Sequence, residues 1–275
     1  MDIHSIIIII SLFYFSLTAG IDWRDYPTCK IGRLQSPIKI KEYESIYANN
    51  FSFVYQSYKS CKKDKVDGNY AHIIYYCKEG GGYINFERGG VIKQYEFIRA
   101  ELYPALHEVD GEKGEYELHL IHKKNLDFVT NKNQYRSIQD PNMYLVIVLR
   151  YQECGEGKAC TYDNGLLKQL NEDSINLGTY NIFQDKRAYF YEGSFVRIPC
   201  DENVNYYIVK DFFHYQKNDV NITNPSNENV ITINNFANIF GRPVYKNFMN
   251  YREVLESHHF SFKNALAFLF IIIFI

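Results

Sequence analysis

The sequence predicts a mainly β (α+β) protein built on a large, mostly antiparallel, twisted β-sheet with a few short helices. Two observations support this prediction. Segments rich in Ile, Val, Tyr and Phe recur along the chain and are separated by Gly, Asn and charged turns, as in strands joined by short loops. Aromatic residues, which favour the pleated surface of a sheet, make up 17% of the 275 residues.

Seven segments have the composition of strands. They are residues 71–77, 83–86, 95–102, 116–122, 144–151, 188–191 and 206–209. The best candidate helix is 163–170, where leucines recur at helical spacing, with an extension through Asn176 as the longer alternative. The run Gly80-Gly81-Gly82 predicts a hairpin turn between the flanking strands, because no G-K-[ST] follows it as in a phosphate-binding loop.

The charge balance argues against one class of function. The chain has 30 Lys and Arg residues against 32 Asp and Glu residues, a net charge of −2, and contains no long basic run. Binding to nucleic-acid phosphates needs clustered Lys and Arg, so no nucleic-acid partner is expected. With 46% hydrophobic residues the composition is that of a folded chain.

The two ends of the sequence predict export and attachment. Residues 6–15 form an apolar stretch followed by small residues, so 1–20 is predicted to be a signal peptide. This stretch is shorter than the roughly 20 apolar residues that span a bilayer. Segment 258–275 ends in an apolar run and resembles a GPI-attachment signal, with Ser257 as the nearest small residue before it. A short membrane-inserted tail and a buried terminal element are the alternatives.

The intervening residues, 21–257, are predicted to form one domain, secreted or held at the extracellular face of the plasma membrane. Six cysteines fall within it: Cys29, Cys61, Cys77, Cys154, Cys160 and Cys200. An even number of cysteines without a C-x-x-C pair predicts three disulfides in an oxidising compartment rather than a zinc ribbon. Asn50 and Asn221 begin glycosylation sequons, which fits an exported glycoprotein.

One predicted strand carries a candidate metal ligand. Alternate side chains of a strand share a face, so Glu117, His119 and Ile121 are expected to point to the same side. An acidic neighbour suits a histidine that binds metal. On residue types alone, the alternative is a histidine that is simply packed or solvated.

Four separated motifs resemble the α-class carbonic anhydrases. Residues 35–38 (Q-S-P-I) are similar to the family's Q-S-P-[IV], and 117–122 (E-L-H-L-I-H) to its E-L-H-L-V-H strand. Residues 191–204 resemble the Y-x-G-S-L-T-T-P-P-C-x-E-x-V stretch, and 241–244 (G-R-P-V) the later N-x-R-P-x. The order and spacing of these motifs extend the resemblance over about 23–245.

The resemblance implies a zinc enzyme, but one whose ligand set is incomplete here. Active members hold Zn²⁺ with three histidines, two from an H-x-H strand and one from the E-L-H strand, and keep a fourth position for water. His119 stands at the third position. Alignment of Gly89-Gly90 and Tyr95 with the family places Glu101 and Tyr103 where the H-x-H histidines belong.

Residues around the metal position also differ from the family. In active members a Glu orients a Thr hydroxyl, which in turn orients the zinc-bound hydroxide. Leu106 stands at that Glu position, and Val196 and Arg197 stand at the family's Thr pair. Glu117 keeps its place beside the remaining ligand, and His72 stands where the family carries its proton-shuttling histidine.

Two sets of contacts are expected from this comparison. Arg197 is a substitute charge or a ligand-contact group, and an ion pair with Glu101 is expected to fill the cavity, because buried charges need partners. The resemblance also implies the disulfide Cys29–Cys200 of secreted members. Proximity in sequence then pairs Cys61 with Cys77 and Cys154 with Cys160.

These observations predict an exported, surface-anchored carbonic-anhydrase-like protein with a defective zinc site. We expect it to be non-catalytic and to bind an unidentified extracellular ligand or protein, with no cofactor. The first alternative is an active zinc carbonic anhydrase with the unconventional ligands Glu101, Tyr103 and His119. His107 is the nearest histidine that could complete such a set, but it fits the family's S-E-H histidine. A structural coat protein of the cell surface is the second alternative.

Overall fold

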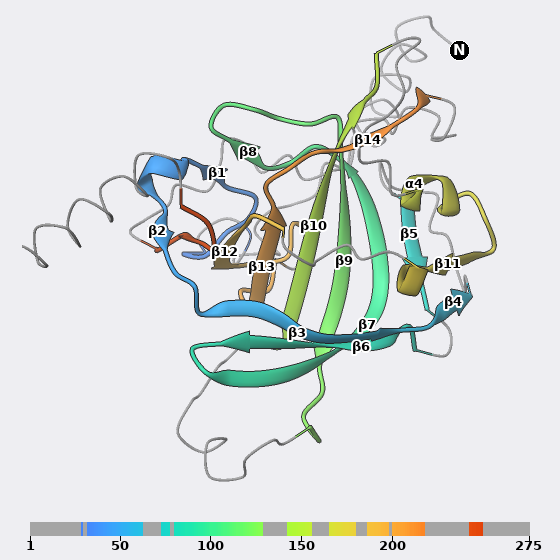
Figure 1. Cartoon of the computed structure of the whole chain (residues 1–275), viewed down its shortest axis with the longest axis horizontal. Helices are drawn as coiled ribbons and strands as arrows, with labels where there is room; N and C mark the ends of the chain where they lie inside the picture. The colour runs from blue at the N-terminus through green and yellow to red at the C-terminus, as the bar shows by residue number, and fades with distance from the viewer. Residues whose placement is uncertain are drawn as a thin grey trace, which may run out of the picture.

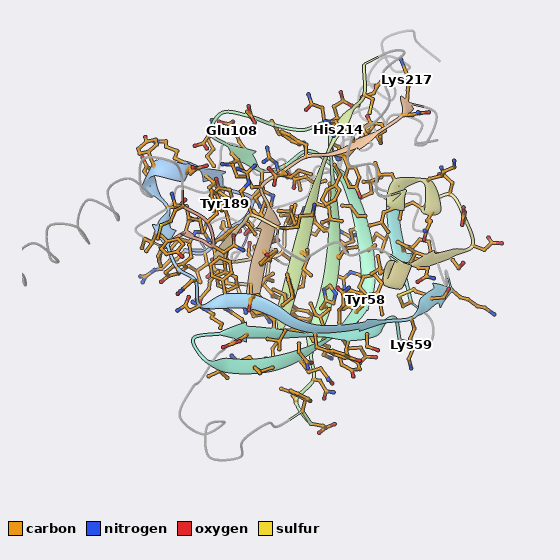
Figure 2. The ribbon with its side chains drawn as sticks, in the orientation of Figure 1. Tyr58, Lys59, Glu108, Tyr189, His214 and Lys217 are labelled. Atoms are coloured by element: carbon orange, nitrogen blue, oxygen red, sulfur yellow. A yellow bond between two sulfur atoms is a disulfide. The ribbon has the colours of Figure 1, made fainter. Side chains whose placement is uncertain are left out.

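A computed structural model describes residues 29, 32–62, 73–77, 80–128, 142–155, 165–179, 186–197, 200–217 and 242–249. Its centre is a large twisted sheet in which β10, β9 and β7 run side by side, while β3 and β6 cross near one end of them (Figure 1). Side chains cover both faces of this sheet (Figure 2). The mainly β fold class predicted from the sequence is confirmed.

Within the described residues, the main sheet has eleven strands. In spatial order nine of them are β2 (Ile46–Tyr47), β15 (Tyr245–Lys246), β12 (Ala188–Gly193), β13 (Val204–Val209), β10 (Tyr144–Glu153), β9 (Tyr116–Lys124), β7 (Val91–Pro104), β6 (Gly82–Arg88) and β3 (Phe51–Tyr58). In addition, β14 (Phe213–Tyr215) pairs with β10, and β5 (Ile73–Tyr76) pairs with β7. Two small sheets join β1 (Lys39–Ile40) to β8 (Glu108–Val109) and β4 (Ser60–Lys62) to β11 (Ser174–Asn176).

All seven predicted strands are present. The sheet contains more parallel strand pairs than the mostly antiparallel arrangement predicted from the sequence. Strand β10 runs antiparallel to β9 and parallel to both β13 and β14. Strand β3 has eight residues and was not predicted, because polar and aromatic side chains are interspersed along it. Parallel pairing brings together segments far apart in sequence, which composition does not reveal.

The predicted helix is shorter than expected. Helix α4 spans Leu166–Gln169, and the short 3₁₀ helices are η2 (Glu42–Glu44) and η3 (Leu177–Thr179). The extension through Asn176 is wrong, since Ser174–Asn176 forms strand β11 and pairs Ile175 with Cys61 of β4. Burial of Ile175 in the core outweighs the helical spacing of the preceding leucines.

The predicted hairpin at the glycine run is also wrong. Strand β5 lies opposite the second half of β7, with Ile73 facing Leu102, and β6 lies opposite the first half, with Tyr83 facing Glu96. The two strands therefore follow one another along the same edge of β7 rather than pairing together. Gly81 lies against this edge: a Cβ atom there would come 2.2 Å from the Phe97 ring, so only glycine fits.

Two hydrophobic cores lie on opposite faces of the central strands. Leu118 and Leu120 of β9 belong to the larger core, together with the buried residues of α4 and β11. Ile121 of β9 and Val146 and Val148 of β10 belong to the second core. The alternation predicted for 116–122 is therefore present, and it places His119 on the face of the second core.

Two expected disulfides are present, Cys29–Cys200 and Cys61–Cys77. Cys154 is also disulfide-bonded, while Cys160 lies outside the described residues.

Asn50 is exposed, as a glycosylation site must be, and its modification stays a prediction. Segments 1–20 and 258–275, Asn221 and His72 likewise lie outside the described residues. Of the helices in the described part, none is long and apolar enough to cross a membrane.

Candidate functional site

The candidate site is built on β7 and β9. Arg99, Glu101 and Tyr103 alternate along β7 and so share one face of the sheet. The antiparallel register sets Glu101 opposite His119 and Tyr103 opposite Glu117. Residues that sequence alignment assigned to a metal site therefore do lie together.

These strands form one wall of a cavity of about 270 Å³. Further lining comes from β10, the next strand of the same sheet, from β13, and from the chain around Phe195 that follows β12. The lining residues are Arg99, Glu101, Tyr103, His119, Ile121, Tyr144, Val146, Phe195, Val196, Arg197, Asp201 and Tyr206. The charged side chains of Arg99, Glu101 and Arg197 meet on one side of the cavity, while apolar and aromatic side chains from β9, β10 and the chain around Phe195 make up most of the rest.

Glu101 is the centre of the charged side, and its carboxylate is only 2% exposed. Its Oε1 atom accepts a hydrogen bond from Arg99 Nε at 2.6 Å and lies 3.6 Å from Arg197 Nη1. Its Oε2 atom accepts a hydrogen bond from the Tyr103 hydroxyl. Burial alone would raise the pKa of Glu101, but the two guanidiniums and the Tyr103 hydroxyl outweigh it and hold that pKa below its ordinary value. The carboxylate is therefore ionised at neutral pH.

The expected ion pair between Glu101 and Arg197 is present, but Arg99 is the closer partner. Arg99 was not among the residues predicted for the site. The signal was available, because a residue two places before Glu101 in a strand must share its face. Arg99 also lies over the Phe195 ring, with its guanidinium carbon 5.6 Å from the ring centroid.

A second buried carboxylate, Glu117, lies behind His119. It accepts hydrogen bonds from the His107 backbone N–H at 2.6 Å and, through Oε2, from His107 Nδ1 at 2.8 Å and His119 Nε2 at 3.0 Å. Burial would raise the pKa of Glu117, yet these donors bring it far below its usual range. Both ring nitrogens therefore carry protons that point at Glu117.

The network continues from His107 to the N-terminal segment. His107 Nε2 lies 2.8 Å from the Tyr191 hydroxyl, which is 3.1 Å from Ser36 Oγ. Burial lowers the pKa of His107 and keeps it neutral, so Tyr191 donates to His107 Nε2. The Tyr191 ring also stacks on Tyr206, a cavity residue, at a centroid distance of 4.9 Å.

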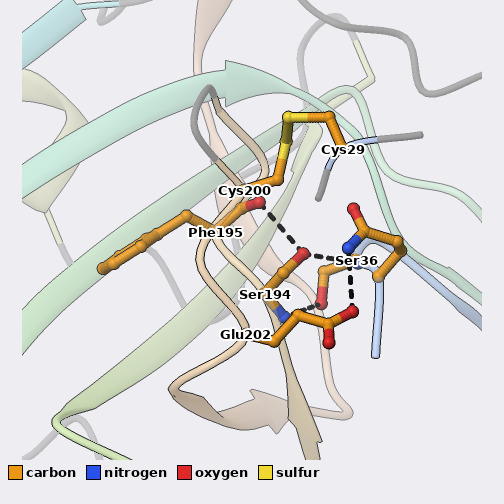
Figure 3. Close-up of a disulfide and its surroundings, with 7 residues drawn as sticks. Cys29, Ser36, Ser194, Phe195, Cys200 and Glu202 are labelled. Carbon is orange, nitrogen blue, oxygen red and sulfur yellow. Dashed lines mark hydrogen bonds between the residues drawn. A yellow bond between two sulfur atoms is a disulfide. The ribbon is translucent and has the colours of Figure 1, made fainter. Parts of the chain in front are cut away.

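The chain that carries Arg197 is fixed by contacts to this same segment (Figure 3). The Ser36 backbone N–H donates to Ser194 Oγ at 3.1 Å, and the Ser194 N–H donates to Ser36 Oγ at 3.2 Å. Just beyond Arg197, Cys200 is bonded to Cys29, and its N–H donates to the Arg197 carbonyl at 2.7 Å. The backbone of Arg197 is thus held between two anchor points.

Leu106 and Val196 make an apolar contact where the family resemblance implies a hydrogen bond. Leu106, Val196 and Tyr103 form a small buried cluster of their own. The resemblance implies a Glu at position 106 and a Thr pair at positions 196 and 197, with the Glu orienting a Thr hydroxyl. Leu106 and Val196 are apolar here and pack together, and Arg197 stands at the second Thr position, so neither position of the Thr pair offers a hydroxyl to orient a zinc-bound hydroxide.

The side chains at the three ligand positions do not fit a zinc site in this arrangement. Only His119 offers an imidazole, and each Glu101 oxygen already accepts a hydrogen bond. Burial and the neighbouring Glu101 raise the pKa of Tyr103 well above its usual value, so its phenol stays protonated and is a poor metal ligand.

The described part of the chain contains another cluster of potential metal ligands, formed by His107, Glu117 and His119. Each residue offers one ligand atom, and these atoms lie within 4.8 Å of one another. The His107 Nδ1–H and His119 Nε2–H groups of this cluster already donate hydrogen bonds to Glu117 Oε2. A metal would have to displace both ring protons from a fully buried carboxylate. In this arrangement Glu117 holds the rings of both His107 and His119 in place.

The curved sheet, the E-L-H strand on its face and the cavity above that strand define an α-carbonic-anhydrase type of domain. A family model described as eukaryotic-type carbonic anhydrase matches residues 19–248. The chain therefore belongs to the eukaryotic-type carbonic anhydrase family.

Individual relatives are distant. Carbonic anhydrase 6 of Mus musculus is 24% identical over 95% of this chain and 92% of its own length. A halotolerant carbonic anhydrase from Dunaliella salina superposes with a TM-score of 0.58 at 20% identity, covering 82% of this chain and 91% of that one. A dioscorin crystallised with ascorbate superposes with a TM-score of 0.57 at 19% identity, covering 81% and 89%. At these identities the solved structures establish the fold only.

Proposed function

We propose that this chain is a non-catalytic member of the carbonic anhydrase family that acts by binding, with an ion pair in place of the zinc ion. The observation that carries the proposal is the pairing of Glu101 with Arg99 at 2.6 Å. A guanidinium at this distance supplies the positive charge that the metal supplies in active members, and it is covalently part of the chain.

Electrostatics support this assignment. Two cationic side chains lie within 3.6 Å of the Glu101 carboxylate, and a Zn²⁺ ion beside them would be repelled by both. Binding zinc would also require Glu101 to give up its Arg99 hydrogen bond inside a buried site, where an unpaired guanidinium is costly.

The paired change at Leu106 and Val196 supports the same conclusion independently. If only the ligands had changed, the remaining machinery would still be suited to orienting a hydroxide. Instead Leu106, at the Glu position, and Val196, in the Thr pair, are apolar and in contact. Even a metal held by His119 would therefore lack the hydrogen bond that aligns its water for attack on CO2.

The location proposed for this activity is outside the cell. The disulfides fit an oxidising compartment. We propose export through the 1–20 signal peptide and surface attachment through 258–275, either by GPI transfer or as a membrane-inserted tail. The partner is an extracellular ligand or protein.

The alternative is a zinc carbonic anhydrase with an unconventional ligand set, and one observation favours it. His119 still donates Nε2–H to Glu117 at 3.0 Å, which is how a family ligand is oriented toward a metal. We regard this network as retained for packing, because Glu117 and His107 are fully buried and need each other as partners.

Stopped-flow CO2 hydration separates the two functions. The full chain, produced in a secretory host and supplied with excess zinc, is expected to hydrate CO2 no faster than buffer. A rate well above buffer that is abolished by chelation and by His119→Ala would establish the zinc enzyme instead. Lys39→Gln, a change of an exposed residue on β1 outside the cavity, is the matched control and should alter neither result.

A further inference from the structure

The cavity has a cationic inner end. Arg99 and Arg197 both approach one oxygen of Glu101, so two positive charges share one buried negative charge. Asp201, the fourth charged lining residue, is exposed to solvent, where its charge is screened. Among the described lining residues, Arg99, Glu101 and Arg197 together contribute one net positive charge to the inner end of the cavity.

Arg99 still has hydrogen-bonding capacity toward a ligand. Its Nε donates to Glu101, whereas its two terminal nitrogens make no hydrogen bond with any residue that the structure describes. These nitrogens are not among the buried polar atoms that lack partners, and the side chain is 22% exposed. They can thus donate to an anion that enters the cavity. Arg197, 31% exposed, lines the same space.

The remaining walls are apolar and aromatic. Ile121 and Val146 belong to a buried core and face the cavity from β9 and β10. Tyr144 and Phe195 form an edge-to-face pair at a centroid distance of 4.8 Å on the same side. A volume of about 270 Å³ is large enough for a single small ring with one substituent.

We propose that this cavity binds a small organic anion, an aromatic or cyclic monocarboxylate. Its carboxylate accepts hydrogen bonds from Arg99 and Arg197, and its ring lies against Ile121, Val146 and Phe195. Guanidinium groups match carboxylate geometry, and an apolar wall favours a ring over a strongly hydrated inorganic ion. The inference rests on the proposed function, because a zinc ion in this cleft would itself take the anion.

Binding of benzoate, measured by calorimetry on the full-length protein with EDTA present, tests the proposal. Benzoate is expected to bind at least about tenfold more tightly than benzamide, which has the same ring without the charge. Inorganic phosphate is expected to bind more weakly than benzoate. Equal binding of benzoate and benzamide, or tighter binding of phosphate, would overturn the proposal without any mutation.

Variants then locate the site. Arg197→Gln is expected to weaken benzoate binding about tenfold, since it removes one guanidinium from a partly exposed position. Arg187→Gln removes an equivalent charge from an exposed ion pair with Asp211 and should leave binding unchanged. Equal loss in both variants, or none in Arg197→Gln, would contradict the assignment.

Failure of this inference is distinguishable from failure of the proposed function. If the protein contains no zinc, is inactive and does not bind benzoate, the ligand class is wrong and the non-catalytic assignment stands. If benzoate binds only when zinc is supplied and EDTA abolishes the binding, the anion is a metal ligand and both proposals fall.

Discussion

Arg99 Nε lies 2.6 Å from Glu101 Oε1, two residues away on the same strand. Neighbours at this spacing share a face, so the contact is local and needs no distant element to form. It places a permanent positive charge beside a position where active relatives carry a zinc ligand. Under the proposed non-catalytic function, this one contact both stabilises the site and opposes zinc binding.

Glu101→Gln should destabilise the fold. The change leaves Arg99 beside a neutral amide in a largely buried site, and we expect a loss of about 1–3 kcal/mol in the free energy of unfolding measured with urea. Arg88→Gln, which removes an ion pair with Glu192 of which both members are over a third exposed, is the matched control and should cost less than about 1 kcal/mol. Similar losses in the two variants would show that Glu101 is not a buried ion pair.

Acid should remove the contribution of Glu101. Its folded-state pKa lies below the ordinary value of 4.5, so the unfolded chain binds the proton more readily. The stabilisation is therefore fully present above that value and is lost as the pH falls below it. Urea unfolding between pH 5 and pH 3 should show a shallower loss of stability in Glu101→Gln than in the unchanged protein. Identical slopes would contradict the depressed pKa.

His122 should impose a second, separate pH dependence. Its Nδ1 lies 3.0 Å from the Leu120 carbonyl and its Nε2 is 2.9 Å from the hydroxyl of Tyr58, which is labelled in Figure 2. Burial lowers the pKa of His122 from 6.5 to about 3. The unfolded chain takes up the proton first, so stability should fall as the pH decreases from 6.5, by at most about 1.4 kcal/mol per pH unit.

His122→Asn tests this dependence, because the amide keeps a donor near the Nδ1 position but does not titrate. We expect a smaller loss of stability between pH 6.5 and pH 5 than in the unchanged protein. Glu101→Gln is the control, since its effect is confined to lower pH. If the slope above pH 5 is the same in His122→Asn, another group is responsible for it.

Rebuilding the ligand set should restore zinc binding without full turnover. Arg99→Gln, Glu101→His and Tyr103→His together supply three imidazoles with His119 and remove the closest cation, so zinc affinity should rise by roughly two orders of magnitude or more. CO2 hydration should stay low until Leu106→Glu and Val196→Thr rebuild the orienting pair. Competition with a chromogenic chelator measures the first effect and stopped-flow hydration the second. High turnover in the triple variant alone would contradict the role assigned to the pair.

Several features of the site were predictable because strand periodicity is local. The shared face of Glu117, His119 and Ile121 followed from alternation, and the structure places them as expected. The proximity of Glu101 and Arg197 followed from alignment with the family. Arg99 was overlooked even though the same alternation applies to it.

Other features depend on long-range pairing that no local pattern reveals. The glycines at 80–82 have turn composition, but the strands on either side both pair with β7, so the chain continues along one edge instead of reversing. The parallel alignment of β13 with β10 likewise joins segments about 60 residues apart. The apolar contact between Leu106 and Val196 became visible only once these strands were placed.

Zinc content tests the central claim most directly. Protein produced from the full chain in zinc-supplemented medium, purified and mildly dialysed, is to be measured by elemental analysis alongside the Arg99→Gln, Glu101→His, Tyr103→His variant as a positive control. The ion-pair account predicts essentially no zinc in the unchanged protein and about one per chain in the variant. About one zinc per chain in the unchanged protein, lost on His119→Ala, would contradict it.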